Sequence, residues 1–297
     1  MFMKKTSISR KAFMIFNYSL MVVVCLSCIL PFVHLLALSL SDKTAVSAGK
    51  VVFFPVDFTL SAYEFALKKG DFLRGFFNAI LRVILGTGTN LVLMLLTAYP
   101  LSKDKSKLLG RDIYMAYFFI TMLIGGGLIP TYLVVVKLGL RNSIWSLILP
   151  GALPVYNMII LMNFIRSLPE ELQEAARIDG ASEMKLLYKI LFPLLKPSLA
   201  TVGLFSIIGH WNEWFSAIIY MQDRKKYPLA TYLQTLLRSF EAILNNAGTD
   251  YEELISMMNV QTGRAAQLFL AALPVLIAYP FLQKYFTAGL TLGSVKG

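Results

Sequence analysis

The chain has 297 residues, of which 57% are hydrophobic and only 15% charged, and its mean hydropathy is +0.64. Soluble domains carry about 25% charged residues, so this composition excludes an ordinary soluble protein and predicts a membrane protein. The net charge of +11 is scattered between apolar runs rather than gathered on one face with aromatic residues, which argues against nucleic-acid binding.

Six uncharged runs are long enough to cross a bilayer, which takes about 20 helical residues. The first begins within a stretch, 12–41, that is far longer than the roughly 7–15 apolar residues of a cleavable signal, so we expect it to remain as a span. Because lipid offers backbone groups no partners, the runs are expected to be helices in an all-α polytopic fold. In chain order the expected spans lie near 14–40, 76–101, 113–136, 142–165, 198–220 and 265–283, the fifth interrupted by Glu213.

The distribution of Lys and Arg predicts the orientation of these spans. With the amino terminus inside, the cytoplasmic segments hold 15 of these residues and the outer ones 12, and the short basic loop at 103–107 falls inside. Both termini are therefore predicted to be cytoplasmic. The expected organisation is a cytoplasmic segment 1–13 and one transmembrane domain 14–297, with cytoplasmic loops 102–112 and 166–197 and outer loops 41–75 and 221–264.

The segment 166–197 contains residues that typically begin and end helices. Ser167 is expected to cap a short helix with Pro169 in its first turn, and Gly180 to end it in a left-handed conformation. Ser182 then caps a second helix that Pro193 ends. One face of the first helix is small and apolar (Leu172, Ala175, Ala176 and Ile178), which fits either a docking element or an amphipathic helix on the bilayer surface.

The motif inside this segment resolves that choice by resemblance. Residues Glu174-Ala175-Ala176-Arg177-Ile178-Asp179-Gly180-Ala181, followed by Ile190 and Pro193, resemble the EAA loop of binding-protein-dependent ABC importer permeases. In that family the loop is a coupling helix that inserts into an ATPase subunit. The resemblance therefore implies ATPase-coupling roles for Glu174, Ala175, Ala176, Asp179, Gly180, Ala181 and Pro193.

The resemblance covers nearly the whole chain and is similar to the carbohydrate permeases, in particular the subgroup for complex oligosaccharides and polysaccharide fragments. Supporting stretches are Leu38-Ser39-Leu40-Ser41, Phe54-Pro55, Gly125-Gly126-Gly127-Leu128-Ile129-Pro130-Thr131-Tyr132, Gly139-Leu140-Arg141-Asn142, Trp211-Asn212 and the tail 289–297. It implies a homologous second permease, two ATP-binding subunits, an extracytoplasmic binding protein and an oligosaccharide cargo. A permease of the same type for peptides, amino acids or ions shares the coupling loop and remains an alternative.

Polar residues inside the fifth span form the expected substrate pathway. Glu213 is too costly to face lipid, and beside it Trp211, Asn212 and Trp214 offer indoles to stack on sugars and groups to bind hydroxyls. The competing interpretation makes the tryptophans packing or interfacial residues and pairs Glu213 with another subunit. Neither His34 nor Arg82 needs a function, since Arg82 lies close enough to the end of its span to snorkel.

Two further expectations concern mechanism. Gly125 to Gly127 with Pro130 predict either a hinge or broken-helix segment in the third span or a site of close helix packing. The chain has no glycine loop for phosphates, so ATP is expected to be hydrolysed by partner subunits, and no catalytic, cofactor-binding or metal-binding residue is expected; Cys25 and Cys28 alone cannot build a metal site. An ion-driven carrier or membrane-embedded enzyme is disfavoured because so few ionisable residues lie within the spans.

Overall fold

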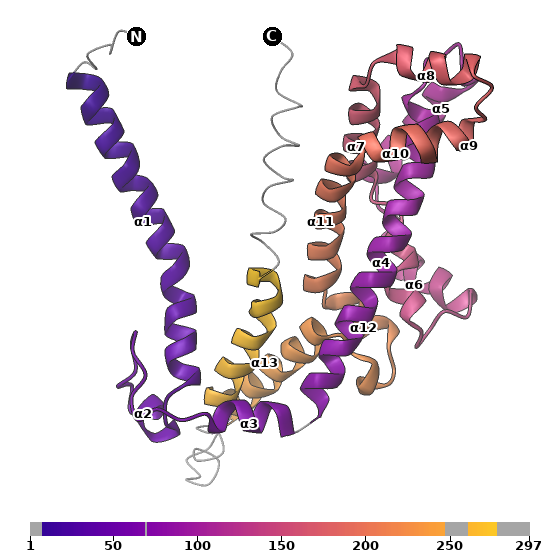
Figure 1. The fold of residues 1–297 in the computed structure, drawn as a ribbon. Coiled ribbons are helices and arrows are strands. Elements are labelled where there is room, and N and C mark those ends of the chain that lie inside the picture. The colour runs from indigo at the N-terminus through magenta and orange to yellow at the C-terminus, as the bar shows by residue number, and fades with distance from the viewer. Residues whose placement is uncertain (1–7, 69, 247–260, 278–297) are drawn as a thin grey trace. The chain divides into compact units, whose positions relative to one another are not determined.

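The computed structural model describes residues 8–68, 70–246 and 261–277 (Figure 1). These residues are predominantly helical and contain no strand, only an isolated antiparallel bridge between Ser41 and Phe58. The chain divides into two compact units, Met1–Gly70 with Arg238–Ala272 and Asp71–Leu237 with Leu273–Gly297. The helical content agrees with the all-α fold predicted from the sequence.

The first unit begins with a long apolar helix, α1 (Ile8–Ser39), whose side chains are almost all exposed. A small core of Ala37, Ala45, Val46 and Val51 packs its C-terminal end against the following turn. In that turn Asp42 caps the short helix α2 (Lys43–Ser47), and α3 (Ser61–Lys68) follows. Residues 261–277 are also helical.

The second unit is built around the long helix α4 (Asp71–Ser102), which runs along α7 (Val155–Ser167) and α11 (Lys196–Asn212) (Figure 1). The other helices of this unit are shorter. They are α5 (Arg111–Leu123), α6 (Leu128–Lys137), η1 (Ile144–Leu147), η2 (Leu149–Gly151), α8 (Glu170–Ile178), α9 (Glu183–Lys185), η3 (Leu186–Leu191), α10 (Phe192–Leu194), α12 (Phe215–Tyr220), η4 (Arg224–Lys226) and the start of α13 (Leu229–Asn246).

One apolar core joins the long helices to the segment after α7. It contains Met94 and Leu95 of α4, Leu161 of α7 and Val202 of α11, all nearly inaccessible to solvent. Ala176 of α8 and the η3 leucines Leu186, Leu187 and Leu191 belong to the same core. The segment between the fourth and fifth predicted spans is therefore a packed part of the bundle.

The predicted spans are more broken than the hydropathy alone indicates. Two helices, α1 and α4, are long and apolar enough to span a bilayer, and three bent helix pairs raise the number to at most five among the described residues. The sixth predicted span, 265–283, extends beyond residue 277 and so lies partly outside them. By length and composition, the first and second predicted spans coincide with α1 and α4.

The bends have local causes in the sequence. The third span breaks after Leu123, and α5 and α6 meet at 112°, with Gly127 at a left-handed φ of 82°; the predicted interruption is confirmed, whereas the hinge remains a hypothesis. A continuous helix over 142–165 is wrong, because Pro150, Gly151 and Pro154 leave only short 3₁₀ turns before α7. The predicted outer loop 221–264 contains α13, which the sequence pattern did not indicate.

Candidate functional site

The turn between α8 and α9 has the geometry expected from its punctuation. The amide of Ala181 donates to the carbonyl of Ala176 at 2.9 Å and that of Gly180 to Arg177 at 3.0 Å, the paired bonds of a Schellman motif. Gly180 adopts φ +74°, which only glycine tolerates without strain. The predicted cap by Ser167 is wrong: Ser167 ends α7 and donates to the Phe164 carbonyl, because the chain needs the extended residues 168 and 169 before α8 starts.

Six of the seven predicted coupling residues divide between two faces of this segment. Ala176 is 7% exposed and Ala181 packs against the same core, so both anchor the turn. Exposed residues form the opposite surface; they are Glu174, Ala175, Asp179 and Gly180 of the prediction, together with Ile178, which is 86% exposed. The segment therefore has one face packed in the bundle core and one exposed face.

Pro193 lies where the segment joins the bundle. Ser182 caps α9, as predicted, by accepting from the Lys185 amide. The chain then forms the π-helical turn η3, which ends directly before Phe192 and Pro193; a proline removes a backbone donor and displaces the helical pattern before it. The helical segment continues past Pro193 to Leu194, so the prediction that Pro193 ends it is wrong by one residue, and Glu183–Leu194 and Lys196–Asn212 meet at 82°.

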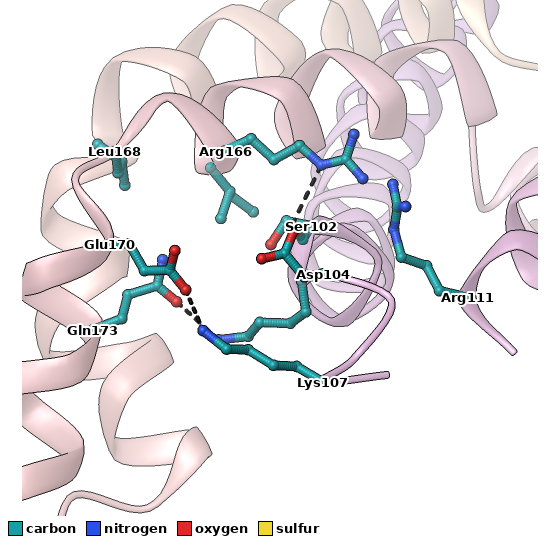
Figure 2. A pocket seen from close by; sticks show the side chains of 10 residues that line it. Ser102, Asp104, Lys107, Arg111, Arg166, Leu168, Glu170 and Gln173 are labelled. Carbon is teal, nitrogen blue, oxygen red and sulfur yellow. Dashed lines mark hydrogen bonds and ion pairs between the residues drawn. The ribbon is translucent and has the colours of Figure 1, made fainter. Parts of the chain in front are cut away.

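A polar cavity of about 330 Å³ separates α8 from the C-terminal end of α4 (Figure 2). Lys107 pairs with Glu170 across it, and Lys103 donates to the Gln173 carboxamide at 2.8 Å. From the other side Arg111 and Arg166 donate to the Leu101 carbonyl, at 3.0 and 3.1 Å. Cations at the C-terminal carbonyls of a helix are stabilised by its dipole, so the two arginines fix this end of α4.

The electrostatic environment around α8 and α9 favours the charged forms of Glu170, Lys107 and Glu183. The hydrogen bond and charge of Lys107 lower the pKa of Glu170, and the same bond raises the pKa of Lys107. Burial acts to raise the pKa of Glu183, but hydrogen bonds from Arg177 and Tyr99, with the charge of Lys103, outweigh it and hold that pKa at about 2. These ion pairs therefore persist at neutral pH.

A second cavity, of about 340 Å³, lies within the bundle where α11 ends. Its polar lining includes Asn90, Ser146, Asn157, Ser206, His210 and Glu213. Arg82 donates to the Glu213 carboxylate at 2.5 Å, to the Glu213 carbonyl at 2.8 Å and to the Leu147 carbonyl at 3.2 Å. The two charges neutralise each other, and amides, hydroxyls and an imidazole remain to bind polar groups.

Gly86 in α4 makes room for His210, one of the residues that line this cavity. A Cβ added at Gly86 would lie 2.5 Å from Nε2 of His210, so the imidazole packs directly on the helix backbone. The Asn90 amide is 3.3 Å from the same nitrogen. The His210 ring is thus held between α4 and α11 at the edge of the cavity.

Only one of the four predicted pathway residues lines this cavity. Glu213 does, at the break between α11 and α12. Trp211 packs edge-on against Phe76, Trp214 packs edge-on against Phe215, and Asn212 is exposed. The geometry of the two indoles agrees with the packing interpretation.

Arg82 is the residue that the sequence interpretation most misjudged. It does not snorkel: it is 2% exposed and paired with Glu213 inside the same chain. The space between the packed helices supplies a carboxylate and backbone carbonyls that bind the guanidinium, whereas lipid supplies neither. Asn90, Asn157 and Ser206 were missed as well. Their signal in the sequence is a polar residue within an apolar run, but only the packing shows which of these point inward.

Comparison with known proteins identifies the family of this chain. Residues 59–291 match the family described as the binding-protein-dependent transport system inner membrane component. The chain belongs to this family. The resemblance predicted from the EAA loop is thereby confirmed, and so is the expectation of an integral membrane permease component rather than an enzyme.

Relatives of this permease match it over nine-tenths or more of both chains. The polygalacturonan/rhamnogalacturonan transport system permease protein YtcP of Bacillus subtilis is 38% identical over 94% of this chain and 96% of its own length. The melibiose/raffinose/stachyose import permease protein MelC of the same organism is 32% identical over 90% and 91%. Among solved structures, a chain of a bacterial ABC transporter involved in the import of the acidic polysaccharide alginate has a TM-score of 0.85 and 31% identity, covering 95% of this chain and 99% of that one.

Proposed function

We propose that this permease is a transmembrane subunit of an ATP-driven importer for oligosaccharides. It pairs with a homologous second permease, two ATP-binding subunits and an extracytoplasmic binding protein. The observation that carries the proposal is the exposed α8–Gly180 turn, anchored in the bundle core by Ala176 and presenting Glu174, Ala175 and Ile178 outward. Membership of a binding-protein-dependent transport family supports it.

The proposed topology has six spans with both termini in the cytoplasm. Lys103, Lys105, Lys107 and Arg111 gather in the short loop after α4, where the positive-inside rule has most weight. This loop and α8 meet at the cavity in Figure 2, so both lie on the same side of the membrane. The coupling turn then faces the cytoplasm, where ATP is hydrolysed.

In the proposed mechanism the exposed turn inserts into an ATP-binding subunit, and closure of the two ATPases changes the access of the bundle from one side to the other. The rigid Schellman turn suits this role because its anchor residues are buried while its tip is free. ATP and its chemistry belong to the partner subunits. The residues proposed for coupling are those of the EAA loop, from Glu174 to Ala181, with Pro193 at the bend.

The proposed cargo is an oligosaccharide, and the cavity beside Glu213 is part of its path. The lining of paired charges, amides and hydroxyls matches the hydrogen-bonding pattern of sugar hydroxyls. The names of the relatives specify polygalacturonan and rhamnogalacturonan in one case and melibiose, raffinose and stachyose in the other, which supports a carbohydrate cargo. Ligand binding by the cognate binding protein, measured by calorimetry across sugars, peptides and amino acids, distinguishes this cargo from the alternatives.

The coupling role is tested by replacing Gly180 with valine in the complete complex reconstituted in lipid vesicles. Valine is strained at φ +74°, so the turn is displaced, and we expect loss of both sugar uptake and the stimulation of ATP hydrolysis by loaded binding protein. Gly49→Val is the matched control, because Gly49 has φ +67° and open space around it but lies in the first unit. Normal coupling in the assembled Gly180→Val complex would contradict the proposal.

A further inference from the structure

The segment proposed to receive motion packs into the bundle core through Ala176 and the η3 leucines, and it has two further attachments to the bundle. One attachment is the chain itself, which continues from α9 through η3 and the 82° bend into α11. The other is a set of side-chain contacts with the end of α4, which the EAA motif does not include.

Lys103 is the centre of the second attachment. Its ammonium lies 2.9 Å from the Tyr99 hydroxyl, 2.8 Å from Gln173 Oε1 and 3.5 Å from the Glu183 carboxylate. Tyr99 donates to Glu183 as well, and Lys103 lies 4.2 Å from the centre of the Tyr99 ring. With 11% of its side chain exposed, Lys103 is a buried cation that joins α4 to both α8 and α9.

One outer ion pair reinforces this contact, and a second lies within the coupling segment and fixes Glu183. Lys107 pairs with Glu170 at the start of α8, and Arg177 at its end donates to Glu183 at 2.9 Å. The loop after α4 supplies cations and the coupling segment supplies carboxylates. We name the residues Tyr99, Lys103, Lys107, Glu170, Gln173 and Glu183 the clasp.

From the clasp, α4 continues as one helix to the cavity beside Glu213. Tyr99 and Arg82 are 17 residues apart, which is about 26 Å along a helix. Arg82 holds the break between α11 and α12 through Glu213 and holds η1 through the Leu147 carbonyl. The same helix therefore touches the coupling segment at one end and the cavity at the other.

The mechanical properties of the two routes differ. The first route follows the backbone from α9 into α11 and passes through a π-helical turn and a sharp bend. Such interruptions can absorb a displacement by changing their angle. A helix with an intact hydrogen-bond ladder resists axial compression. Along α4 the single proline, Pro100, removes one ladder bond, the bond to the Leu96 carbonyl in the last turns, and the helix continues through it as one element.

We propose that α4 transmits the movement of the coupling segment to the cavity, and that Lys103 is the positioning residue that attaches α4 to that segment. The inference rests on the proposed function, because it assumes that α8 is displaced by an ATPase. It assigns a role in energy coupling to residues outside the EAA loop.

The test uses Lys103→Met in the reconstituted complex, with sugar uptake per ATP hydrolysed as the readout. Methionine keeps the length of the side chain but removes its three donors, and we expect the ratio to fall about fivefold or more, the lower range of coupling between linked sites, while the complex assembles and hydrolyses ATP. Lys103→Arg should retain most of the ratio. Lys105→Met is the matched control, because Lys105 is 73% exposed and pairs only with Asp112 at the surface.

A charge exchange gives an independent measurement. Lys107→Glu and Glu170→Lys should each lower the ratio, and the double variant should restore it, because the pair is re-formed with its ends reversed. An unchanged ratio in Lys103→Met would overturn the inference. If Gly180→Val uncouples the complex and Lys103→Met does not, only the α4 route fails; if neither uncouples it, the proposed function fails too.

Discussion

The ion pair between Arg82 and Glu213 gives the sharpest quantitative prediction. The Arg82 side chain is 3% exposed and the Glu213 side chain 36% exposed, so the two partners are not equivalent. Removing one member of a buried pair costs about 3–5 kcal/mol when the other is left without compensation. Glu213→Leu leaves the buried guanidinium its carbonyl partners but no opposite charge, so the loss should lie at the lower end of that range.

Arg82→Met should cost less. The carboxylate of Glu213 keeps the Ser216 amide at 2.8 Å and the Ser216 hydroxyl, and it faces the cavity, where water can solvate it. We expect about 2 kcal/mol, close to a hydrogen bond made by a charged group. The double variant Arg82→Met with Glu213→Leu should cost about the same as Arg82→Met alone, because no charge is then stranded.

The assay is a double-mutant cycle on the free energy of unfolding, measured by titrating the purified permease in mixed micelles with sodium dodecyl sulfate. The pair of Arg74 and Asp71 at the start of the same helix is the control, since both side chains are about half exposed and the pair should contribute less than about 1 kcal/mol. If the two single losses at Arg82 and Glu213 add within about 0.5 kcal/mol, the pair is not coupled and the reasoning is refuted.

Two further predictions follow from packing and from charge. Gly86→Ala should destabilise the permease by about 1–3 kcal/mol in the same unfolding assay and reduce uptake, since the new methyl group displaces the His210 ring. The control is Gly88→Ala on the same helix, which has open space around it and should be neutral or slightly stabilising. Equal effects of the two variants would contradict the packing of His210 against Gly86. The pKa of Glu183 is about 2, below the ordinary value of 4.5, so its contribution to stability is complete above pH 4.5 and is lost as the pH falls toward 2. Melting temperatures between pH 6 and 2.5 should therefore fall less steeply for Glu183→Gln than for the unmodified chain, and parallel curves would show that Glu183 makes no such contribution.

Several features of this permease follow from local sequence information. Long apolar runs predict helices in a membrane because lipid leaves the backbone no other way to form its hydrogen bonds. The turn around Gly180 was predictable because a Schellman motif depends on one glycine and its immediate neighbours. The interruption at Gly127 was visible for the same reason, because it depends on residues at the break itself. Glu213 was expected only as a charge within the fifth span, and the end of α11 beside it needed the structure.

Features that depend on partners far apart in the chain needed the tertiary structure. Arg82 and Glu213 are separated by 131 residues, and Tyr99 and Glu183 by 84, so no local sequence pattern predicts either contact. Hydropathy likewise gave a continuous helix over 142–165, because it counts apolar residues and does not register the backbone bonds that Pro150 and Pro154 remove. A buried charge is acceptable only where its surroundings supply the opposite charge and hydrogen bonds, and those surroundings exist only once distant helices have packed together.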